Sequence, residues 1–597
     1  MKTENIRNVA IVAHVDHGKT SLIDQLLKGT EALDRKESTQ TLLMDSNEQE
    51  KERGITILSK VTAIHWKQHR INIIDTPGHA DFSGEVERVL GMADAVALLI
   101  DAVDGPMPQT RFVAERAIKK GLMPIVVINK IDRHEADPDN ALNNVFDLLV
   151  TLGANDTQLD FPVIYCSARY GYAYSEGGIH TEPGNMEPLL DALVECVKAP
   201  ASSICRSLKL QITQLDFCDY QGLIGIGRIS DGKICSGQRV SISDTEGNIR
   251  FAQVRDIFHH VGLAKVKIDE GIAGDIIAVT GIGNIRISDV IGHSDTPVFM
   301  PKLEIDKPTV SVRIGVNNSP KANSEGHALQ SRELGHRLFK ETMYNVSLNV
   351  KSTRDPDIFE VSGRGELHLG VLIEDMRREG FEFVVSRPQI IMDEFNDKYE
   401  PYENVVIDCE PSFCGHVIKE LADRRIIIES HEALSNGHSR MVFCGPKRGT
   451  LGIRHTLLSL TEGTASIHKE YAGMKVKING LLGHRTRGVM VSNGGGKALI
   501  HSLSQLQSRG RLMIQHGDMV YAGQIIGETS TNSDMWVNCR QGKNLVPMWR
   551  NVSDKNYAMK EIKKLSLEEA LTWINNDEWI EVTPSSIRLK KRSCTVS

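Results

Sequence analysis

The sequence lacks the features that mark membrane-spanning, secreted and zinc-binding proteins. No run approaches the roughly 20 apolar residues needed to span a bilayer, and the apolar run near the N-terminus soon meets charges, as in a buried strand. Ten cysteines occur without a C-x-x-C pair, and Cys409 and Cys414 have no second pair to complete a zinc site. We therefore expect reduced thiols in a cytoplasmic chain with no membrane partner.

An excess of positive charge is also absent. The 70 Lys and Arg residues are outnumbered by 77 Asp and Glu residues, which gives a formal net charge of −7. This balance argues against a generally basic nucleic-acid binder, so any RNA contact must come from local patches. Hydrophobic residues make up 40% and charged residues 25% of the chain, the balance of a folded globular protein. Its 597 residues exceed a single core and predict four or five domains.

The first 200 residues alternate apolar runs with helix-like segments. The runs are NVAIVAHV, INIIDTPG, AVALLIDA, MPIVVINK and FPVIYCSA. Strands buried on both faces suit a mainly parallel sheet covered by helices, so residues 1–202 are predicted to form an α/β domain. From Ser207 the pattern changes to short strands separated by D-G, S-G and E-G turns, which predicts an antiparallel β-barrel over residues 203–300.

The rest of the chain is predicted to form three further domains. Residues 301–394 show a β-α-β-β-α order, which is typical of a split βαβ sandwich, and residues 395–480 resemble them. Residues 481–597 are rich in Gly and Ser, then turn helical at SLEEALTWINNDE and end in a basic tail. The predicted fold class is a multidomain α/β and β chain.

A phosphate-binding loop is predicted at AHVDHGKTS, residues 13–21, between a strand and the helix pattern SLIDQLL. Backbone N–H groups of such a loop and of the helix N-terminus bind phosphate, a lysine neutralises charge, and a hydroxyl binds Mg²⁺. The usual first glycine is Ala13, which is tolerable if its backbone is not left-handed. The predicted nucleotide contacts here are Asp16, His17, Gly18, Lys19, Thr20 and Ser21, with Thr20 also a Mg²⁺ ligand.

Two side chains of this loop keep more than one interpretation. Asp16 either binds a monovalent cation beside the phosphates or caps the loop, and both interpretations stay open. His17, like His14, is favoured as a packing residue over a catalyst.

Three more motifs follow in the order that a guanine-nucleotide site requires. In DTPGH at 75–79, Asp75 suits a water-mediated contact to Mg²⁺, and Gly78 an N–H contact to a γ-phosphate. In NKID at 129–132, Asp132 is suited to accept both N–H groups of the guanine edge, which adenine does not offer. The other predicted contacts are Asn129, which braces base and loop, Lys130, Ile131, Ser167 and Ala168. The motifs together predict a site for GTP and GDP with Mg²⁺.

The segments AHVDHGKT, RGITI at 53–57 and DTPGHADF at 75–82 resemble the translational GTPases. The resemblance implies that Thr56 binds Mg²⁺ and closes over the γ-phosphate. It also implies that His79 is the catalytic histidine, which positions or polarises the attacking water once the ribosome rearranges it. Val15 and Ile55 match the apolar pair that screens this histidine at rest.

The remaining blocks resemble the BipA/TypA group over essentially the full length, and the last of them are VNCRQGKNL and LEEALTWINNDEWIEVTPSSIRLKKR. The resemblance implies a GTP-binding domain, a β-barrel, two ferredoxin-like domains and a distinct C-terminal domain. It implies a monomer whose partners are the ribosome (70S or a subunit), ribosomal RNA and tRNA, with a role under stress or low temperature. The tRNA-mimicking domain of elongation factor G is absent, which disfavours a mainstream elongation factor.

Basic residues near the C-terminus are the candidates for RNA contact, since cationic side chains hold phosphates without reading sequence. The alternative is a solvated face that keeps the domain soluble. The candidates are Arg485, Arg487, Lys497, Arg509, Arg511, Lys543, Arg588, Lys590, Lys591 and Arg592.

Two functional hypotheses follow. The first is a ribosome-stimulated GTPase whose nucleotide state sets its affinity for the ribosome. The second is a nucleotide-gated scaffold or assembly factor in which hydrolysis only drives release. The intact Thr56, Gly78 and His79 favour the first.

Overall fold

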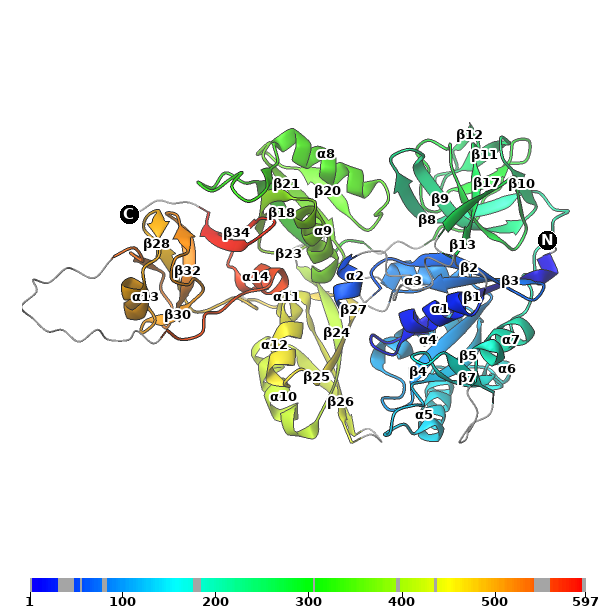
Figure 1. Cartoon of the computed structure of the whole chain (residues 1–597), viewed down its shortest axis with the longest axis horizontal. Coiled ribbons are helices and arrows are strands. Elements are labelled where there is room, and N and C mark those ends of the chain that lie inside the picture. The colour runs from blue at the N-terminus through cyan, green and yellow to red at the C-terminus, as the bar shows by residue number, and fades with distance from the viewer. Residues whose placement is uncertain are drawn as a thin grey trace, which may run out of the picture. The chain divides into compact units, whose positions relative to one another are not determined.

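A computed structural model describes most of the chain. The described residues are 3–30, 48–53, 56–77, 83–175, 184–262, 264–303, 307–392, 398–433, 437–480, 482–541 and 559–592. They divide into two compact units (Figure 1). Unit 1 comprises Met1–Asp306 with Met343–Val346, and unit 2 comprises Lys307–Thr342 with Ser347–Ser597. No described helix is long and apolar enough to cross a membrane.

Unit 1 begins with the predicted mainly parallel sheet. Its seven strands have the order β2-β3-β1-β4-β5-β6-β7, and only the edge strands β2 and β7 pair antiparallel. The strands are β1 (Ile6–Ala13), β2 (Lys60–Trp66), β3 (His69–Asp75), β4 (Ala95–Asp101), β5 (Met123–Asn129), β6 (Val163–Ser167) and β7 (Tyr172–Tyr174). The helical elements are η1 (Thr3–Asn5), α1 (Lys19–Lys28), α2 (Glu48–Arg53), α3 (Ser83–Leu90), α4 (Pro108–Lys119), α5 (Pro138–Thr151), α6 (Asp156–Leu159) and α7 (Glu187–Cys196).

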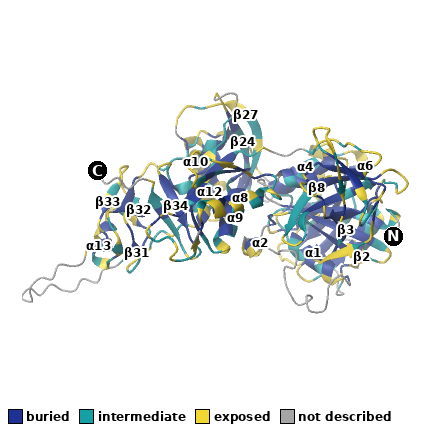
Figure 2. Ribbon diagram, turned by 90° about the horizontal axis from the view of Figure 1, so that it is seen from above, coloured by how far each residue is buried: buried dark blue, intermediate teal, exposed yellow. Residues whose placement is uncertain are grey.

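Both faces of this sheet are buried, which explains the near-continuous apolar runs of its strands. Along β1, Val9 and Ile11 pack in one cluster with residues of α1 and α7, while Ala10 and Val12 pack in another with residues of α3, α4 and α5. Figure 2 shows the interior around β3 as buried. Because parallel strands end at the same edge, the loops after β1, β3, β4, β5 and β6 meet there.

The second part of unit 1 is the predicted antiparallel β-barrel. Its eight-stranded sheet has the order β12-β11-β17-β8-β9-β16-β13-β14, and its core is made largely of Ile, Leu and Val. The strands are β8 (Lys209–Cys218), β9 (Gly222–Asp231), β11 (Arg239–Ser243), β12 (Ile249–Gln253), β13 (Ile257–Val261), β14 (Ala264–Ile268), β16 (Ile276–Val279) and β17 (Val290–His293), with β10 (Lys233–Cys235) and β15 (Glu270–Ile272) forming a separate pair.

Buried polar residues join the barrel to the parallel sheet. Asp275 of the barrel lies 3.7 Å from Arg70 Nε and accepts a 3.2 Å hydrogen bond from Asn72 Nδ2. His259 pairs with the same carboxylate at 2.5 Å. Although burial opposes its ionisation, these partners hold the pKa of Asp275 below its usual value.

Unit 2 begins with the first of the two predicted ferredoxin-like domains. The strand order β20-β21-β18-β22 places the first and last strands of the β-α-β-β-α-β unit side by side, with both helices packed on the sheet. The elements are β18 (Val310–Val316), β19 (His327–Ala328), α8 (Ser331–Thr342), β20 (Asn349–Ser352), β21 (Ile358–Gly363), α9 (Glu366–Arg378), β22 (Phe381–Ser386) and β23 (Gln389–Ile390).

A second ferredoxin-like domain follows, with the strand order β25-β26-β24-β27. Cys409 and Cys414 lie in its core as free thiols, with their Sγ atoms 3.9 Å apart. The elements are β24 (Tyr399–Cys409), η3 (Pro411–Phe413), α10 (Cys414–Asp423), β25 (Ile427–Ala433), β26 (Ser439–Pro446), α11 (Lys447–Thr450), α12 (Ile453–Leu460) and β27 (Ser466–Val476).

The C-terminal part, for which the sequence predicts a boundary at residue 481, shares a sheet with the first ferredoxin-like domain. Its strand β34 pairs antiparallel with β22, so one sheet continues from the first ferredoxin-like domain into the C-terminal part. Its elements are β28 (Val489–Ser492), β29 (Gly496–Lys497), α13 (Ile500–Leu506), β30 (Gly510–Leu512), β31 (Met519–Val520), β32 (Gln524–Thr529), β33 (Met535–Val537), α14 (Leu567–Trp573), β34 (Glu578–Val582) and β35 (Ile587–Lys591).

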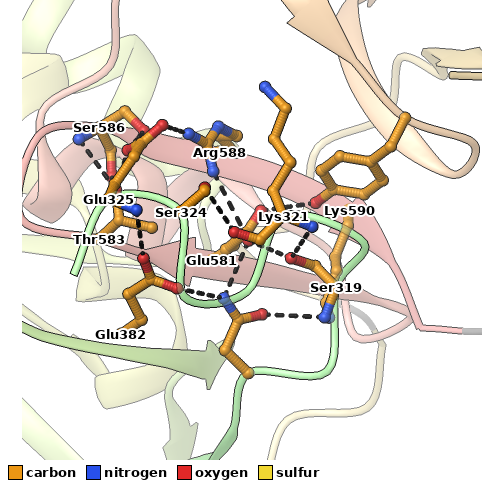
Figure 3. Close-up of polar contacts among 12 residues, drawn as sticks. Ser319, Lys321, Ser324, Glu325, Glu382, Glu581, Thr583, Ser586, Arg588 and Lys590 are labelled. Atoms are coloured by element: carbon orange, nitrogen blue, oxygen red, sulfur yellow. Dashed lines mark hydrogen bonds and ion pairs between the residues drawn. The ribbon is translucent and has the colours of Figure 1, made fainter. Parts of the chain in front are cut away.

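A buried polar network surrounds this junction (Figure 3). Glu581 of β34 is fully buried and accepts hydrogen bonds from Asn317 Nδ2 at 3.0 Å and from the Tyr521 hydroxyl at 2.7 Å. Arg588 of β35 lies 3.6 Å from the Glu581 carboxylate and forms an ion pair with Glu325. The junction is therefore held by charge as well as by strand pairing.

Candidate nucleotide site

The loop after β1 has a backbone that exposes N–H groups at the start of α1. Asp16 and Gly18 have left-handed φ angles of 66° and 93°, and α1 begins directly afterwards at Lys19. No side chain caps the helix, so its first N–H groups are available to an anion. Ala13 belongs to β1 and has no positive φ, which explains why alanine is accepted in the place of a glycine.

Gly18 is required for space as well as for conformation. A Cβ atom at this position would lie 2.6 Å from Asn129 Nδ2. Asn129 stands there because its amide holds two loops together. Its Nδ2 donates to the His17 carbonyl at 2.8 Å, and its Oδ1 accepts from the Ala168 N–H at 2.8 Å. The phosphate-loop segment is thereby tied to the loop after β6.

Lys19, Asp75 and Thr56 form the charged part of the site. Lys19 Nζ lies 2.8 Å from Asp75 Oδ1 and also donates to the Thr76 carbonyl. The Thr56 hydroxyl and Asp75 Oδ2 are buried without a hydrogen-bond partner among the described residues, whereas Asp75 Oδ1 has Lys19 as its partner. Hydroxyl and carboxylate oxygens are the ligands that Mg²⁺ prefers, so this set fits a magnesium ion, with the half-buried Thr20 at the start of α1 as a further hydroxyl.

The loop after β5 carries the predicted guanine contacts. Lys130 has a left-handed φ of 63°, Ile131 donates its N–H to the Cys166 carbonyl at 3.4 Å, and the Asp132 side chain is exposed. Ser167 and Ala168 are buried at the end of β6 and directly after it. The structure therefore brings the predicted base contacts to the same sheet edge as the phosphate loop.

Asp101 is a site residue that sequence reasoning missed. It ends β4 without exposed surface, and its Oδ2 lies 2.6 Å from Lys130 Nζ and 3.5 Å from Arg133 Nη1. Burial opposes its ionisation, but the hydrogen bonds from Lys130 and from the Val103 N–H keep the pKa of Asp101 below its usual value. Its position in the sequence could have revealed it, because Asp101 ends β4 and the next strand, β5, leads into the NKID motif.

The His17 side chain packs into the protein. It is 1% exposed, and its Nδ1 lies 3.4 Å from the Leu99 carbonyl. Burial lowers the pKa of His17 to about 4, so the imidazole is neutral at physiological pH. The buried ring agrees with a packing role for this side chain, and the His17 carbonyl is tied to the site through Asn129.

The other predicted residues of the site divide into described and undescribed ones. Val15 donates its N–H to Gln109 Oε1 at 3.3 Å, and Ser21 is half-buried on α1. The predicted residues Ile55, Gly78, His79 and Lys543 lie outside the described residues.

Three of the predicted RNA contacts are half-buried and form ion pairs with carboxylates of the same chain. Arg485 pairs with Glu578 at 2.7 Å, and its guanidinium lies 3.9 Å from the Trp573 ring centroid. Arg588 holds the junction of Figure 3. The third is Lys591, whose ammonium pairs with the carboxylates of Asp534 and Asp577 at 2.6 Å each.

The other predicted RNA contacts lie at the surface or near it. Lys590 is half-buried and donates to Asn318 at 3.0 Å. The exposed candidates are Arg487, Lys497, Arg509, Arg511 and Arg592.

Comparison with protein families matches most of the chain. Residues 4–199 match the Elongation factor Tu GTP binding domain, residues 222–292 match Elongation factor Tu domain 2, residues 397–479 match the Elongation factor G C-terminus, and residues 487–596 match the TypA/BipA C-terminal domain.

Similar curated proteins extend over the full length. The chain is 49% identical over 593 residues to a Large ribosomal subunit assembly factor BipA of Salmonella typhimurium, with 99% of this chain and 97% of the relative covered. A protein of the same name from Buchnera aphidicola subsp. Schizaphis graminum is 48% identical over 592 residues, with the same coverage. A crystal structure of a Thermus thermophilus protein has a TM-score of 0.54 at 16% identity, covering 79% of this chain and 97% of that one, which supports the fold alone.

Proposed function

The chain belongs to the TypA/BipA family of translational GTPases, and from that premise we propose that it hydrolyses GTP to GDP and phosphate on the ribosome. Its relatives are named as assembly factors of the large ribosomal subunit, so we place its action in subunit assembly or translation, in the cytoplasm and as a monomer. The observation that carries the proposal is the meeting of Lys19, Asp75 and the Asn129 bridge at one sheet edge.

The described residues have roles that suit phosphoryl transfer. Lys19 neutralises phosphate charge, and the α1 N-terminus with Gly18 supplies N–H donors. Thr20 and Thr56 would hold Mg²⁺ through their hydroxyls and Asp75 through a water; the ion, when bound, neutralises charge on the β- and γ-phosphates. Asp132 is proposed to accept from the guanine edge, and the exposed Asp16 to bind a monovalent cation.

The hydrolytic step is assigned by family resemblance to His79 and Gly78. An imidazole beside the γ-phosphate positions the attacking water in line, and positioning is the main catalytic need of phosphoryl transfer. Val15 and Ile55 are proposed to screen the imidazole until the ribosome rearranges it.

The test is GTP turnover by His79→Ala with and without 70S ribosomes. We expect ribosome-stimulated turnover to fall by about 100-fold or more, since positioned catalytic groups contribute about that much, while affinity for fluorescent GTP stays unchanged. His416→Ala, a change at an exposed histidine of α10, is the matched control and should retain full turnover. Stimulated turnover that survives in His79→Ala would remove the catalytic assignment.

The same assay resolves the ribosomal partner and the cation. Turnover is measured with 70S ribosomes, with each separate subunit, and with potassium replaced by choline. Stimulation only by free subunits would move the proposal towards assembly. Equal turnover in potassium and choline would exclude a catalytic cation at Asp16.

A further inference from the structure

Two thiols in the second ferredoxin-like domain lie close enough to react with each other. Cys409 ends β24 and Cys414 begins α10, with Glu410 and η3 between them. Their Sγ atoms are 3.9 Å apart, and both are free thiols. The sequence analysis singles out this pair only as too small for a zinc site, which leaves open what two neighbouring thiols can do here.

The fold holds both side chains in one core. Cys409 follows Ile407 along the inner face of β24, and Cys414 lies in the same hydrophobic cluster. The segment between them is a tight turn, since the Phe413 N–H donates to the Glu410 carbonyl at 3.0 Å. The Cys414 thiol lies 3.7 Å from the same carbonyl. The turn therefore brings the start of the helix back to the end of the strand.

The bond that this pair can form is a disulfide. An S–S bond is about 2.05 Å long, so the two sulfurs must approach each other by roughly 2 Å. Rotation of two short side chains about their Cα–Cβ bonds supplies a movement of this size. Another buried thiol, Cys166, lies instead beside Asn129 Oδ1 at 3.5 Å. Among the cysteines that the structure describes, Cys409 and Cys414 are the two whose sulfurs contact each other.

The two thiols differ in their access to an oxidant. Cys414 is 8% exposed, whereas Cys409 has no exposed surface. Burial raises the pKa of Cys409 to about 12, and the neighbouring Cys414 adds to the rise. Cys409 therefore stays protonated, and a small oxidant reaches Cys414 first.

We propose that Cys409 and Cys414 form a reversible intramolecular disulfide when the protein meets hydrogen peroxide. First the Cys414 sulfur attacks a peroxide oxygen, so that an S–O bond forms and the O–O bond breaks. The thiol proton leaves with the released hydroxide as water. The Cys409 sulfur then attacks the sulfur of this sulfenic acid, so that the S–S bond forms, the S–O bond breaks and a second water leaves. Two thiols are thereby oxidised by two electrons, and one peroxide is reduced to two waters.

The disulfide would tie the end of β24 to the start of α10. A small dithiol reverses it by exchange, in which the dithiol takes over the disulfide and both cysteines regain their protons. The reaction uses no residue of the nucleotide site, so it stands apart from the proposed function.

Tryptic digestion provides the test, because residues 399–419 form one peptide that contains both cysteines. The full chain is reduced, treated with hydrogen peroxide, alkylated with iodoacetamide in urea and digested. In the wild type we expect the peptide to lose two hydrogens and to carry no alkyl group, as measured by mass spectrometry. Treatment with dithiothreitol before alkylation should restore both alkylation sites.

Two single variants separate the steps. Cys409→Ala should leave Cys414 as a sulfenic acid that dimedone labels, whereas Cys414→Ala should leave Cys409 as a thiol that iodoacetamide labels fully. Cys205→Ala, at an exposed cysteine, is the control and should form the disulfide as the wild type does. The wild-type measurement needs no variant, so it decides the matter even where a core substitution impairs folding.

Three results would overturn the proposal. The first is full alkylation of both thiols after peroxide treatment. The second is a sulfinic acid at Cys414 beside a free thiol at Cys409. The third is a disulfide that joins either residue to a different cysteine or to a second chain. Each leaves the proposed function standing, because ribosome-stimulated turnover does not involve these thiols.

Discussion

At the residue scale, the nucleotide site depends on packing around Asn129, and Gly18→Ala tests that packing. The substitution places a Cβ 2.6 Å from Asn129 Nδ2 and strains a φ of 93°, so both hydrogen bonds of Asn129 should be disturbed. We expect GDP affinity to fall at least tenfold, which corresponds to about 1.4 kcal/mol, measured by titration with a fluorescent GDP.

Gly121→Ala is the matched control for this change. Gly121 also has a left-handed φ, 76°, but no atom lies within 4 Å of the added Cβ. It should lose about 1 kcal/mol of folding stability through strain and keep its GDP affinity. If both variants bind GDP equally well, the steric argument for Gly18 fails.

A second residue-scale prediction concerns acid stability. Burial lowers the pKa of His260 in β13 to about 4, with a smaller contribution from the charge of Lys265. The unfolded chain protonates near pH 6.5 and the folded chain near pH 4, so acid favours the unfolded state throughout that interval. Between pH 7 and pH 5 this one group should cost about 2 kcal/mol of unfolding free energy.

His260→Gln should therefore lose less stability than the wild type when the urea midpoint is compared at pH 7 and pH 5. The Arg70 hydrogen bond to residue 260 uses the backbone carbonyl and is retained. His416→Gln, at an exposed position, should lose as much stability as the wild type. An identical pH dependence of His260→Gln and wild type would contradict the assignment.

The sequence predicted much of the site, because motif residues lie at strand ends that a parallel sheet brings together. Asp75, Asn129, Asp132 and Ser167 come from three such ends. The sequence did not predict that Asp101 binds Lys130. This contact forms because β4 and β5 are neighbours in the sheet, and the order of strands in a sheet cannot be read from local sequence. The sequence analysis did favour a packing role for His17, and its ring is buried.

At the element scale, we predict that the strand pair β22–β34 depends on the charge of Arg588, which contacts Glu581 and Glu325 beside it. Arg588→Met leaves Glu581 and Glu325 without their guanidinium. Removing one partner of a buried pair costs about 3–5 kcal/mol, so unfolding of the full chain in urea should begin at a lower concentration.

The double variant Arg588→Met/Glu581→Gln tests the cause. Neutralising the unpaired carboxylate should recover part of the loss, because Asn317 and Tyr521 still bond to the amide. The exposed neighbour Arg592 supplies the control, and Arg592→Met should leave the midpoint unchanged. If Arg588→Met unfolds with the wild-type midpoint, the junction does not depend on this charge.

The sequence predicted helices and strands correctly where a single run of apolar residues, or a single repeat of apolar residues, defines the element. The apolar runs became β1, β3, β4, β5 and β6, and the turn-separated strands formed the barrel. The pairing of β34 with β22 was not predictable, because strand partners about 200 residues apart are chosen by fit between faces and not by local pattern.

At the scale of the whole molecule, the chain has more predicted domains than compact units. Within unit 1, Arg70, Asn72 and Asp275 make the barrel and the GTP-binding domain share buried polar contacts. Within unit 2, one core cluster contains Val310 and Ile373 of the first ferredoxin-like domain together with Val489 and Leu571 of the C-terminal part. The domain boundaries at 202, 300, 394 and 480 remain proposals. They divide the chain by sequence family and do not imply that each segment is a separate compact unit.

The shared sheet has a mechanical consequence for the C-terminal part. A module on a flexible linker could move without its neighbour, whereas the β22–β34 pairing and the Arg588 ion pairs join the C-terminal part to the first ferredoxin-like domain through one hydrogen-bonded sheet. A force applied to the C-terminal part would therefore be transmitted directly to the first ferredoxin-like domain through this sheet.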